Sequence, residues 1–483
     1  MELKNSSLFR QQAFINGSWV DSENKQQQPV YNPSTGLLIG HVPILSKEQV
    51  KLSISSAESA WKGWRELAAK QRAAILRTWF DLIIQNQQDL ATIMTLEQGK
   101  PINEARGEII YGASFVEWFA EEAKRVYGDT IPAPSADKRI IVIKQPIGIV
   151  AAITPWNFPH AMITRKCAPA LAAGCPVIIK PASETPFSAL ALAELAQQAG
   201  IPDGVFNVVT GKASVIGAEL TSNTSVRKLT FTGSTEVGKT LMRQCADTIK
   251  KVSLELGGNA PFIVFDDADL DAAVEGLMAS KFRNTGQTCV CANRIFVQDA
   301  VYDQFAEKLT NKVEQLIIAD GMSETAQQGP LINQQAVDKV NEHINNAVGL
   351  GASVLTGGKQ HTLGGLFFQP TILTNVTTDM QITHEETFGP VAPLYRFHDD
   401  QQAIDLANDT PFGLAAYFYS QNIKRVWRTA EALEAGIVGI NSGIVSTEVA
   451  PFGGVKESGI GREGSKYGLD DFLEMKYLCL GEM

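Results

Sequence analysis

The sequence has few cysteines and few histidines, and neither type forms a recognisable pattern. Six cysteines are scattered through 483 residues, which is too sparse for a disulfide framework and typical of a reducing cytoplasm. The six histidines show no ligand spacing, and Cys289 and Cys291 have no second cysteine pair to complete a zinc site. We therefore expect a cytoplasmic protein without a catalytic metal.

The chain also lacks long apolar runs and an excess of positive charge. No apolar run approaches the roughly 18 residues that cross a bilayer, and the first residues lack the apolar stretch of a signal peptide. The net charge is -10, whereas nucleic-acid binding needs a basic surface. These absences argue against a membrane protein and a nucleic-acid partner. An anionic substrate would need positive charge placed locally in its site.

What the chain does contain is the pattern of a large α/β protein. Its length predicts two or three domains. Short strands are expected over residues 14–45 and helices over residues 46–126. From residue 146 onward, apolar strands alternate with helices, as in a parallel sheet that is covered on both faces. The expected strands are 149–154, 177–180, 205–209 and 228–232, the expected helices 188–199 and 235–245, a second such region spans 260–441, and further strands are 139–144 and 471–479.

One segment matches the Walker A pattern of P-loop NTPases. Gly233-Ser-Thr-Glu-Val-Gly238-Lys239-Thr240 lies where a strand turns into a helix, and Asp266 ends a candidate Walker B strand. However, Glu236 would place a carboxylate in the loop that wraps the phosphates. A glycine turn before a helix N-terminus binds any anionic cofactor, including a dinucleotide. We therefore treat the NTPase as a remote alternative.

Cys289 is the strongest candidate for a reactive side chain. It lies in Phe282-Arg-Asn-Thr-Gly-Gln-Thr-Cys289-Val-Cys291, where small polar neighbours leave the sulfur reachable and backbone amides free to bind a reacting oxygen. The thiolate is the nucleophile, and it needs a partly exposed environment rich in donors. A buried structural cysteine is the alternative, but the polar loop favours catalysis.

Five further segments combine small residues with reactive ones. They are Thr154-Pro-Trp-Asn157-Phe-Pro159, Lys180-Pro-Ala-Ser183, Glu255-Leu-Gly-Gly-Asn259, Glu386-Thr-Phe388-Gly-Pro390 and Pro451-Phe-Gly-Gly-Val-Lys456. In this order and spacing, together with the Cys289 segment, they resemble the aldehyde dehydrogenase superfamily over essentially the whole chain. Agreement at six separate segments makes the resemblance highly specific.

The resemblance implies a mechanism based on three residues. Cys289 would attack an aldehyde, while the Asn157 side-chain amide and the Cys289 backbone N–H would stabilise the oxyanion. Hydride would pass to a nicotinamide cofactor, and Glu255 would activate the water that hydrolyses the thioester. A capping or salt-bridge role is the alternative for Glu255. The residues expected at the cofactor, with ordinary packing as the alternative, are Trp156, Lys180, Ser183, Gly233, Ser234, Thr235, Gly238, Glu386 and Phe388.

Ser183 favours NADP over NAD. Many members of the family carry Glu at this place, three residues after the lysine that Lys180 matches, where it binds both ribose hydroxyls and repels a 2′-phosphate. Ser183 beside Lys180 leaves room and positive charge for the phosphate. Because Glu184 follows directly, NAD stays open as an alternative.

Arg165 and Arg283 indicate an anionic aldehyde. Arg165 follows Asn157 on the next expected helix and Arg283 precedes Cys289, and the arginine fork binds a carboxylate through two parallel hydrogen bonds. Two structural salt bridges are the alternative. The surroundings resemble the succinate-semialdehyde dehydrogenase branch, which implies that both arginines and Ser446 hold the distal carboxylate. We therefore expect succinate semialdehyde as substrate, in 4-aminobutyrate degradation, with glutarate semialdehyde, one methylene longer, left open.

The resemblance also implies an α/β fold with two doubly wound domains and a β-arm. Residues 1–128 and 149–255 would form a Rossmann-like NAD(P)-binding domain, residues 256–464 a catalytic domain, and residues 129–148 with 465–483 the oligomerisation arm. Such arms join subunits edge to edge, so a homodimer or homotetramer is expected.

Other interpretations stay open at this point. They include a broader-range aldehyde dehydrogenase that uses NAD, an acylating dehydrogenase that transfers the thioester to coenzyme A, and a non-catalytic crystallin-like protein. The presence of Glu255 opposes the second, and the intact set of Cys289, Glu255 and Asn157 opposes the third. Some members of the branch oxidise the nucleophile to a disulfide with a cysteine two residues on, which would make Cys291 a redox partner, with plain packing as the alternative.

Overall fold

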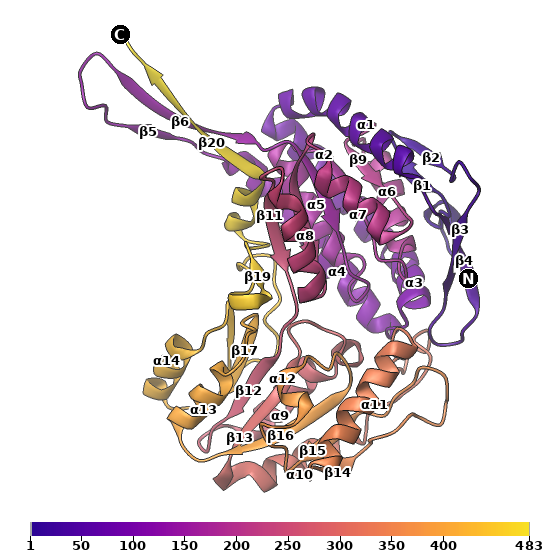
Figure 1. Cartoon of the computed structure of the whole chain (residues 1–483), viewed down its shortest axis with the longest axis vertical. Helices are drawn as coiled ribbons and strands as arrows, with labels where there is room; N and C mark the ends of the chain where they lie inside the picture. The colour runs from indigo at the N-terminus through magenta and orange to yellow at the C-terminus, as the bar shows by residue number, and fades with distance from the viewer. Residues whose placement is uncertain (1, 483) are drawn as a thin grey trace.

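The structure, a computed structural model, describes residues 2–482 and contains two large sheets (Figure 1). The first sheet has eight strands in the order β19-β11-β10-β7-β8-β9-β1-β2, and the strands from β11 to β9 run parallel. The predicted strands are confirmed as β7 to β10. The bounds are β1 Ala13–Ile15, β2 Ser18–Val20, β7 Ile149–Ile153, β8 Val177–Lys180, β9 Phe206–Val208, β10 Val226–Thr232, β11 Lys251–Glu255 and β19 Gly459–Ile460.

Helices cover both faces of this sheet, which explains its continuously apolar strands. In β7, Ile149 and Ala151 pack in one core with α1, α7 and α8, whereas Val150 and Ala152 pack in the other with α2 to α6. The predicted helices within 46–126, over 188–199 and over 235–245 are confirmed. The bounds are α1 Lys47–Glu66, α2 Ala69–Gln85, α3 Gln87–Gln98, α4 Ile102–Glu122, α5 Ala161–Ala173, α6 Phe187–Gln198, α7 Ala213–Ser222 and α8 Thr235–Ala246.

The second sheet has seven strands in the order β14-β15-β16-β13-β12-β17-β18. It is parallel from β15 to β18, with β14 antiparallel at one edge. The predicted second α/β region is therefore confirmed. The bounds are β12 Ala260–Val264, β13 Ala292–Gln298, β14 Ser353–Thr356, β15 Thr371–Thr374, β16 Val391–Phe397, β17 Ala415–Tyr419, β18 Ile437–Ile440, α9 Leu270–Lys281, α10 Tyr302–Val313, α11 Gln334–Gly349, α12 Gln381–His384, α13 Asp400–Asn408 and α14 Ile423–Ala432.

A three-stranded arm projects from the body of the molecule (Figure 1). It contains β5 (Asp129–Ile131), β6 (Arg139–Pro146) and β20 (Leu473–Leu480), and β6 pairs antiparallel with both of the others. The predicted strands over 139–144 and 471–479 are thus confirmed. A separate hairpin of β3 (Gln27–Tyr31) and β4 (Leu38–Pro43) lies near the N-terminus. No helix within residues 2–482 is long and apolar enough to cross a membrane.

The carboxyl edge of the first sheet and the amino edge of the second meet at the middle of the molecule. The chain passes from β11 into β12 through residues 256–259 only. Later it returns, and β19 pairs antiparallel with β11, so this short strand joins the first sheet although it lies within the 256–464 range that we assign to the catalytic domain. Loops from both edges therefore converge on one region.

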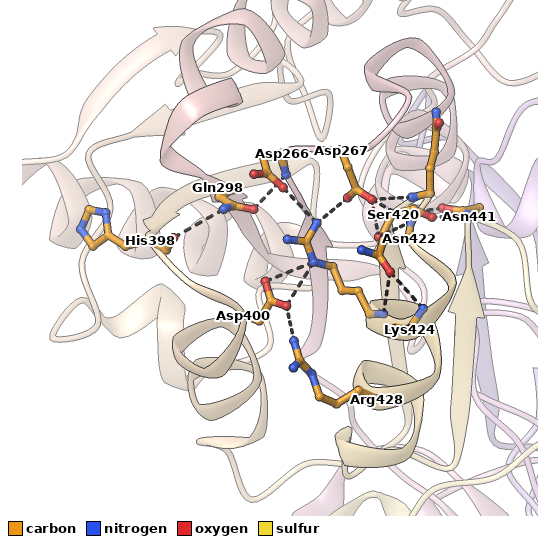
Figure 2. Close-up of polar contacts among 12 residues, drawn as sticks. Asp266, Asp267, Gln298, His398, Asp400, Ser420, Asn422, Lys424, Arg428 and Asn441 are labelled. Atoms are coloured by element: carbon orange, nitrogen blue, oxygen red, sulfur yellow. Dashed lines mark hydrogen bonds and ion pairs between the residues drawn. The ribbon is translucent and has the colours of Figure 1, made fainter.

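The carboxyl ends of the second sheet are closed by a network of polar contacts (Figure 2). Asp267, just after β12, accepts hydrogen bonds from Ser420 Oγ at 2.9 Å and from the Asn422 backbone N–H at 2.8 Å. Asp266 and Asp267 both pair with Arg425 of α14, at 2.9 and 2.6 Å. In many α/β sheets this edge binds the ligand, but here protein side chains fill it.

This arrangement argues against the P-loop interpretation. Asp266 belongs to the network of the second sheet, whereas the Gly233 turn lies at the end of β10 in the first sheet. The Lys239 ammonium, which would have to contact phosphates, pairs with Glu457 at 2.7 Å. The two halves of the Walker pattern therefore do not form one site.

Candidate active site

The candidate residues lie on loops at the two facing sheet edges. From the first sheet, Asn157 follows β7 and Glu255 is the last residue of β11. From the second sheet, Cys289 precedes β13 and Glu386 precedes β16. The two groups of loops approach each other closely at Gly258, where a Cβ would lie 2.6 Å from the Cys289 carbonyl oxygen. The glycine is thus required for the close approach of the Glu255 segment to the Cys289 loop.

The Cys289 thiol is half-buried and strongly influenced by nearby charges. Burial raises its pKa to about 12, and Glu386 and Glu255 act in the same direction, whereas Arg165 and Arg283 lower it. The thiolate is the reactive form. A base must therefore accept the thiol proton when Cys289 attacks.

The loop before Cys289 is held in an unusual backbone conformation. Asn284 and Thr285 have φ angles of 50° and 57°, and Gly286 follows with 74°. A Cβ at Gly286 would lie 2.2 Å from the Gly389 carbonyl oxygen, so only glycine fits there. Successive left-handed residues that are not glycine are rare, and such strain often marks functional loops.

The Asn157 side chain is buried and bonded to the same loop. Its Nδ2 donates to the Gln287 carbonyl oxygen at 3.1 Å, and its Oδ1 accepts from the Phe158 backbone N–H at 3.1 Å. An amide nitrogen carries two hydrogens. One N–H of Asn157 is therefore left for an oxyanion.

Glu255 is a buried carboxylate whose two oxygens can both still accept hydrogen bonds. Its side chain is 4% exposed, and neither oxygen has a hydrogen-bond partner within residues 2–482. A Cβ at Gly453 would lie 3.0 Å from Oε1, so the glycine leaves space beside it. Burial raises the pKa of Glu255 well above its usual value, and the Glu463 carboxylate adds to this. Such a carboxylate is suited to proton transfer near neutral pH.

A cradle for a nucleotide surrounds the N-terminus of α8. Ser234 caps this helix, with its Oγ accepting from the Val237 backbone N–H at 3.4 Å. The Thr235 hydroxyl is buried without a partner within the described residues. A Cβ at Gly257 would lie 3.4 Å from this hydroxyl and 2.9 Å from Glu386 Oε2. The helix N-terminus, the unpaired hydroxyl and the open glycine fit the pyrophosphate and ribose of a dinucleotide.

Other expected cofactor residues adjoin this cradle or support it. The Trp156 and Phe388 rings meet edge to face, with centroids 5.5 Å apart, and Phe388 has a φ of 55°. Burial raises the pKa of Glu386 to about 7. Gly233 and Gly238 serve packing, because a Cβ would meet the Phe231 ring and the Leu256 side chain, respectively, each at 2.4 Å.

Lys180 and Ser183 lie on the loop after β8. Lys180 is buried, its Nζ donates to the Pro181 carbonyl oxygen at 2.9 Å, and burial lowers its pKa while Glu184 opposes this shift. Ser183 is half-buried, and its carbonyl oxygen accepts from Gln28 Nε2 at 3.0 Å. The Ser183 hydroxyl makes no hydrogen bond within residues 2–482, so it is available to a ligand.

The two arginines expected to bind the substrate have different surroundings. Arg165 is buried, its Nη2 lies 2.8 Å from Glu463 Oε2, and its guanidinium lies over the Phe452 ring at 4.0 Å. Arg283 is half-buried, lies over the Phe158 ring at 5.3 Å and has no ion pair within residues 2–482. It also lines a cavity of about 460 Å³.

Tyr111 of α4 connects these arginines and was not identified from the sequence. Its hydroxyl accepts from Arg165 Nη1 at 3.5 Å. Burial raises the pKa of Tyr111, while Arg165, Arg283 and a hydrogen bond with Ser446 lower it. The Tyr111 hydroxyl therefore bonds to Arg165, and Arg283 and Ser446 lie close enough to lower its pKa.

Glu463 is a second residue that sequence reasoning missed. It forms ion pairs with both Lys166 and Arg165. Although burial alone would raise the pKa of Glu463, these two cations hold it below its usual value. Glu463 is thus ionised beside Glu255, and it contributes to the raised pKa of Glu255.

Cys291 follows Cys289 by two residues and is 1% exposed. Its Sγ donates to the carbonyl oxygens of Lys281 and Ala292 at 3.5 and 3.6 Å, and both cysteines are free thiols. No group of three or more His, Cys, Asp or Glu residues within the described chain could hold a metal ion.

Known proteins similar to this chain agree in length, sequence and structure. The model of the aldehyde dehydrogenase family matches residues 19–478. The NADP-dependent succinate-semialdehyde dehydrogenase of Escherichia coli is 64% identical over 481 residues, and the glutarate-semialdehyde dehydrogenase of Pseudomonas aeruginosa is 63% identical over 481 residues, each covering 100% of both chains. The crystal structure of an Escherichia coli NADP-dependent enzyme has a TM-score of 0.99 at 64% identity and covers 99% of this chain and 100% of its own.

Proposed function

Because this chain belongs to the aldehyde dehydrogenase family, we propose that it oxidises succinate semialdehyde to succinate with NADP. The observation that carries the proposal is that Arg165, which bonds to the Tyr111 hydroxyl, and Arg283 both lie close enough to Cys289 to lower the pKa of its thiol. These two arginines supply the local positive charge that an anionic substrate needs in a chain of net charge -10.

Cys289 acts as the nucleophile. Its sulfur forms a bond to the aldehyde carbon, which gives a thiohemiacetal oxyanion. The free N–H of Asn157 and the Cys289 backbone N–H donate to this oxyanion. The high pKa of the thiol means that its proton must pass to a base during attack, and the carboxylates of Glu386 and Glu255 both lie close enough to influence the thiol.

A bound NADP would supply the hydride acceptor that is needed to oxidise the thiohemiacetal to a thioester with Cys289. The capped N-terminus of α8 with Ser234 and Thr235 would hold its pyrophosphate, and Glu386 its nicotinamide ribose. Lys180 and Ser183 would hold the adenosine ribose and its 2′-phosphate, since no carboxylate stands at residue 183 to repel it.

Glu255 then takes a proton from water, which attacks the thioester and releases the acid and the thiol. A carboxylate with a raised pKa is a stronger base than an ordinary one, and no donor within residues 2–482 bonds to Glu255. Hydrolysis by water favours a dehydrogenase that releases a free acid over one that transfers the acyl group to coenzyme A.

Arg283 is the group most available for the distal carboxylate of the substrate. It has no ion pair within residues 2–482, its Nε is buried without a hydrogen-bond partner there, and its side chain lines a cavity of about 460 Å³. Arg165 contributes through Tyr111, because its own charge is shared with Glu463. Ser446, on the loop that follows β18 of the second sheet, completes the site.

Glutarate semialdehyde is the second candidate substrate. The relatives named for succinate and glutarate semialdehyde are 64% and 63% identical to this chain, which hardly separates them. One methylene is worth only about 1–3 kcal/mol of discrimination. Both aldehydes carry the terminal carboxylate that the two arginines suit.

The decisive experiment is a spectrophotometric assay of NADP and NAD reduction with propanal and with the four- and five-carbon semialdehydes. We expect the highest kcat/KM with NADP and succinate semialdehyde, and no activity in the Cys289→Ala variant. A kcat/KM for propanal equal to that for both semialdehydes would contradict an anionic substrate and favour a broad-range aldehyde dehydrogenase.

We also propose a domain organisation, an oligomeric state and a location in the cell. We assign residues 1–128 and 149–255 to cofactor binding, 256–464 to catalysis, and 129–148 with 465–483 to an oligomerisation arm. The arm supports a homodimer or homotetramer, since Met475 and Tyr477 on β20 are exposed apolar residues. Six free thiols are consistent with a cytoplasmic location, and the substrate with 4-aminobutyrate degradation.

A further inference from the structure

Asn284 has no role in the mechanism above, although it lies five residues before the nucleophile and is 1% exposed. Its Nδ2 donates two hydrogen bonds, to the Asn157 carbonyl oxygen at 3.0 Å and to the Gln287 carbonyl oxygen at 3.2 Å. Both hydrogens of the amide are therefore used. One bond goes to the residue that donates to the oxyanion, and the other goes to the loop that carries Cys289.

The orientation of the Asn284 amide is fixed by a third hydrogen bond. Its Oδ1 accepts from Gln98 Nε2 at 3.1 Å, and its backbone N–H donates to Glu104 Oε2 at 2.8 Å. Gln98 ends α3 and Glu104 lies in the first turn of α4. Asn284 is thus anchored to the helical body of the first domain while its donors face the active site.

Asn284 and Asn157 share one acceptor. The Gln287 carbonyl oxygen accepts from Asn157 Nδ2 at 3.1 Å and from Asn284 Nδ2 at 3.2 Å. The Asn157 backbone is held in addition by Lys100, whose Nζ donates to the Asn157 carbonyl oxygen at 2.8 Å. Asn157 is thereby tied to the cysteine loop twice: its side chain bonds directly to the Gln287 carbonyl oxygen, and its own carbonyl oxygen bonds to the Asn284 amide.

We propose that Asn284 is a positioning residue that fixes the distance and direction between the Asn157 amide and Cys289. The proposal rests on the proposed roles of Asn157 and Cys289. An oxyanion donor acts only when it is aimed at the place where charge develops, and a displacement of about 1 Å costs on the order of 100-fold in rate. The two strands that carry these residues belong to different sheets, so a side-chain bridge is needed to set their relative position.

The left-handed backbone of Asn284 suggests the most informative substitution. Glycine adopts a φ of 50° without strain, so Asn284→Gly removes the bridge but keeps the loop conformation accessible. Asn284→Asp is the second variant. It keeps the shape and tolerates the same φ, but a carboxylate cannot donate to two carbonyl oxygens.

Thr285 offers a matched control on the same loop. It has nearly the same φ, 57°, but its Oγ1 donates to the Gly329 carbonyl oxygen at 3.1 Å and forms no hydrogen bond with Asn157. Thr285→Gly introduces the same backbone freedom one residue away. A difference between the two glycine variants therefore reports on the bridge and not on loop flexibility.

The test uses the full-length enzyme with saturating NADP, and both propanal and succinate semialdehyde as substrates. For both aldehydes, Asn284→Gly and Asn284→Asp should lower kcat roughly 10- to 100-fold with KM changed less than about threefold. Thr285→Gly should stay within about threefold of the parent. Rates are referred to the concentration of sites that bind NADPH, titrated by its fluorescence, so that unfolded protein does not count.

A double-mutant cycle with Asn157→Ala separates positioning from a structural role. If Asn284 acts through Asn157, Asn284→Gly should change kcat less than about threefold in the Asn157→Ala background. Equal losses in both backgrounds, or equal losses for Asn284→Gly and Thr285→Gly, would overturn the proposal. Because propanal needs no carboxylate site, a wrong substrate assignment would leave this test intact.

Discussion

The Arg165 guanidinium lies 2.8 Å from the Glu463 carboxylate, in a pair that is almost completely buried. This carboxylate also pairs with Lys166. Removing one member of a buried ion pair leaves an uncompensated charge and typically costs about 3–5 kcal/mol of folding stability. Arg165 therefore contributes to folding as well as to the site, whereas Arg283, without such a partner, is the better residue for a test of substrate binding.

Arg283→Ala should impair the use of succinate semialdehyde much more than the use of propanal. A hydrogen bond to a charged group is worth about 1.5–3 kcal/mol, so kcat/KM for the semialdehyde should fall roughly 10- to 100-fold, mostly through KM. Steady-state kinetics with both aldehydes checks this. Equal losses with the two substrates would show that Arg283 does not bind a carboxylate.

Tyr111→Phe should weaken semialdehyde binding by a smaller amount. The variant removes the hydroxyl that accepts from Arg165 Nη1 but keeps the ring, which packs edge to face on Phe115 with centroids 5.1 Å apart. A hydrogen bond to a charged group is worth about 1.5–3 kcal/mol, but this one is long at 3.5 Å, so KM for succinate semialdehyde should rise only about 2- to 10-fold. An unchanged KM for propanal is the control, and an unchanged KM for the semialdehyde would exclude Tyr111 from the site.

The contrast between Tyr111 and Cys289 shows what the sequence can and cannot predict. Cys289, Glu255 and Asn157 stand at strand ends among small residues, and this local pattern made them visible. The alternation of strands and helices likewise predicted both sheets, because periodicity is a property of neighbouring residues. Tyr111, by contrast, lies within a helical pattern in which it cannot be told from a core aromatic such as Phe115.

Contacts between distant segments explain the other omissions. Glu463 gains its importance only because the chain returns beside β11 and meets Arg165 and Lys166, which lie almost 300 residues earlier. Asn284 was part of the conspicuous cysteine segment, but its contacts with Asn157 and Gln98 depend on how the two sheets face each other. No local pattern encodes such a relationship.

Ser183→Glu should shift the cofactor preference from NADP toward NAD. A carboxylate at residue 183, on the loop after β8 beside Lys180, would repel the 2′-phosphate, and like charges in contact cost several kcal/mol. We expect KM for NADP to rise at least about tenfold, with KM for NAD unchanged or lower. Ser183→Gln, similar in size but neutral, is the matched control. A comparable loss of NADP affinity in this control would attribute the effect to size.

The rate of oxidation should rise with pH across the neutral range. The pKa of the Cys289 thiol is raised to about 12 by burial, and that of Glu255 is raised as well. Both groups act in their deprotonated forms, so each gains activity as pH increases toward its pKa. Because kcat/KM reports the steps up to hydride transfer, which need the thiolate but not the hydrolytic base, log kcat/KM for propanal should increase between pH 6 and 9 with a slope of up to about one per pH unit. A flat or falling profile would contradict these roles.

Glu255→Gln should separate the two halves of the reaction. Hydrolysis of the thioester should slow by a factor of about 100 to 10,000 without the base, so the acylated enzyme should accumulate. Rapid mixing with NADP and aldehyde should then show a burst of about one NADPH per active site, followed by slow turnover. The absence of both burst and turnover would mean that Glu255 is needed already for the attack by Cys289.

Cys291→Ala should not change how the enzyme responds to peroxide. A resolving cysteine must be accessible and readily ionised, but Cys291 is 1% exposed, its pKa is raised by burial, and its Sγ donates to the Lys281 and Ala292 carbonyl oxygens. We therefore expect parent and variant to lose activity at the same rate and to recover equally with dithiothreitol. Reversible loss in the parent together with irreversible loss in Cys291→Ala would instead establish a protective disulfide, and would show that the loop around Asn284 opens far enough for the two sulfurs to meet.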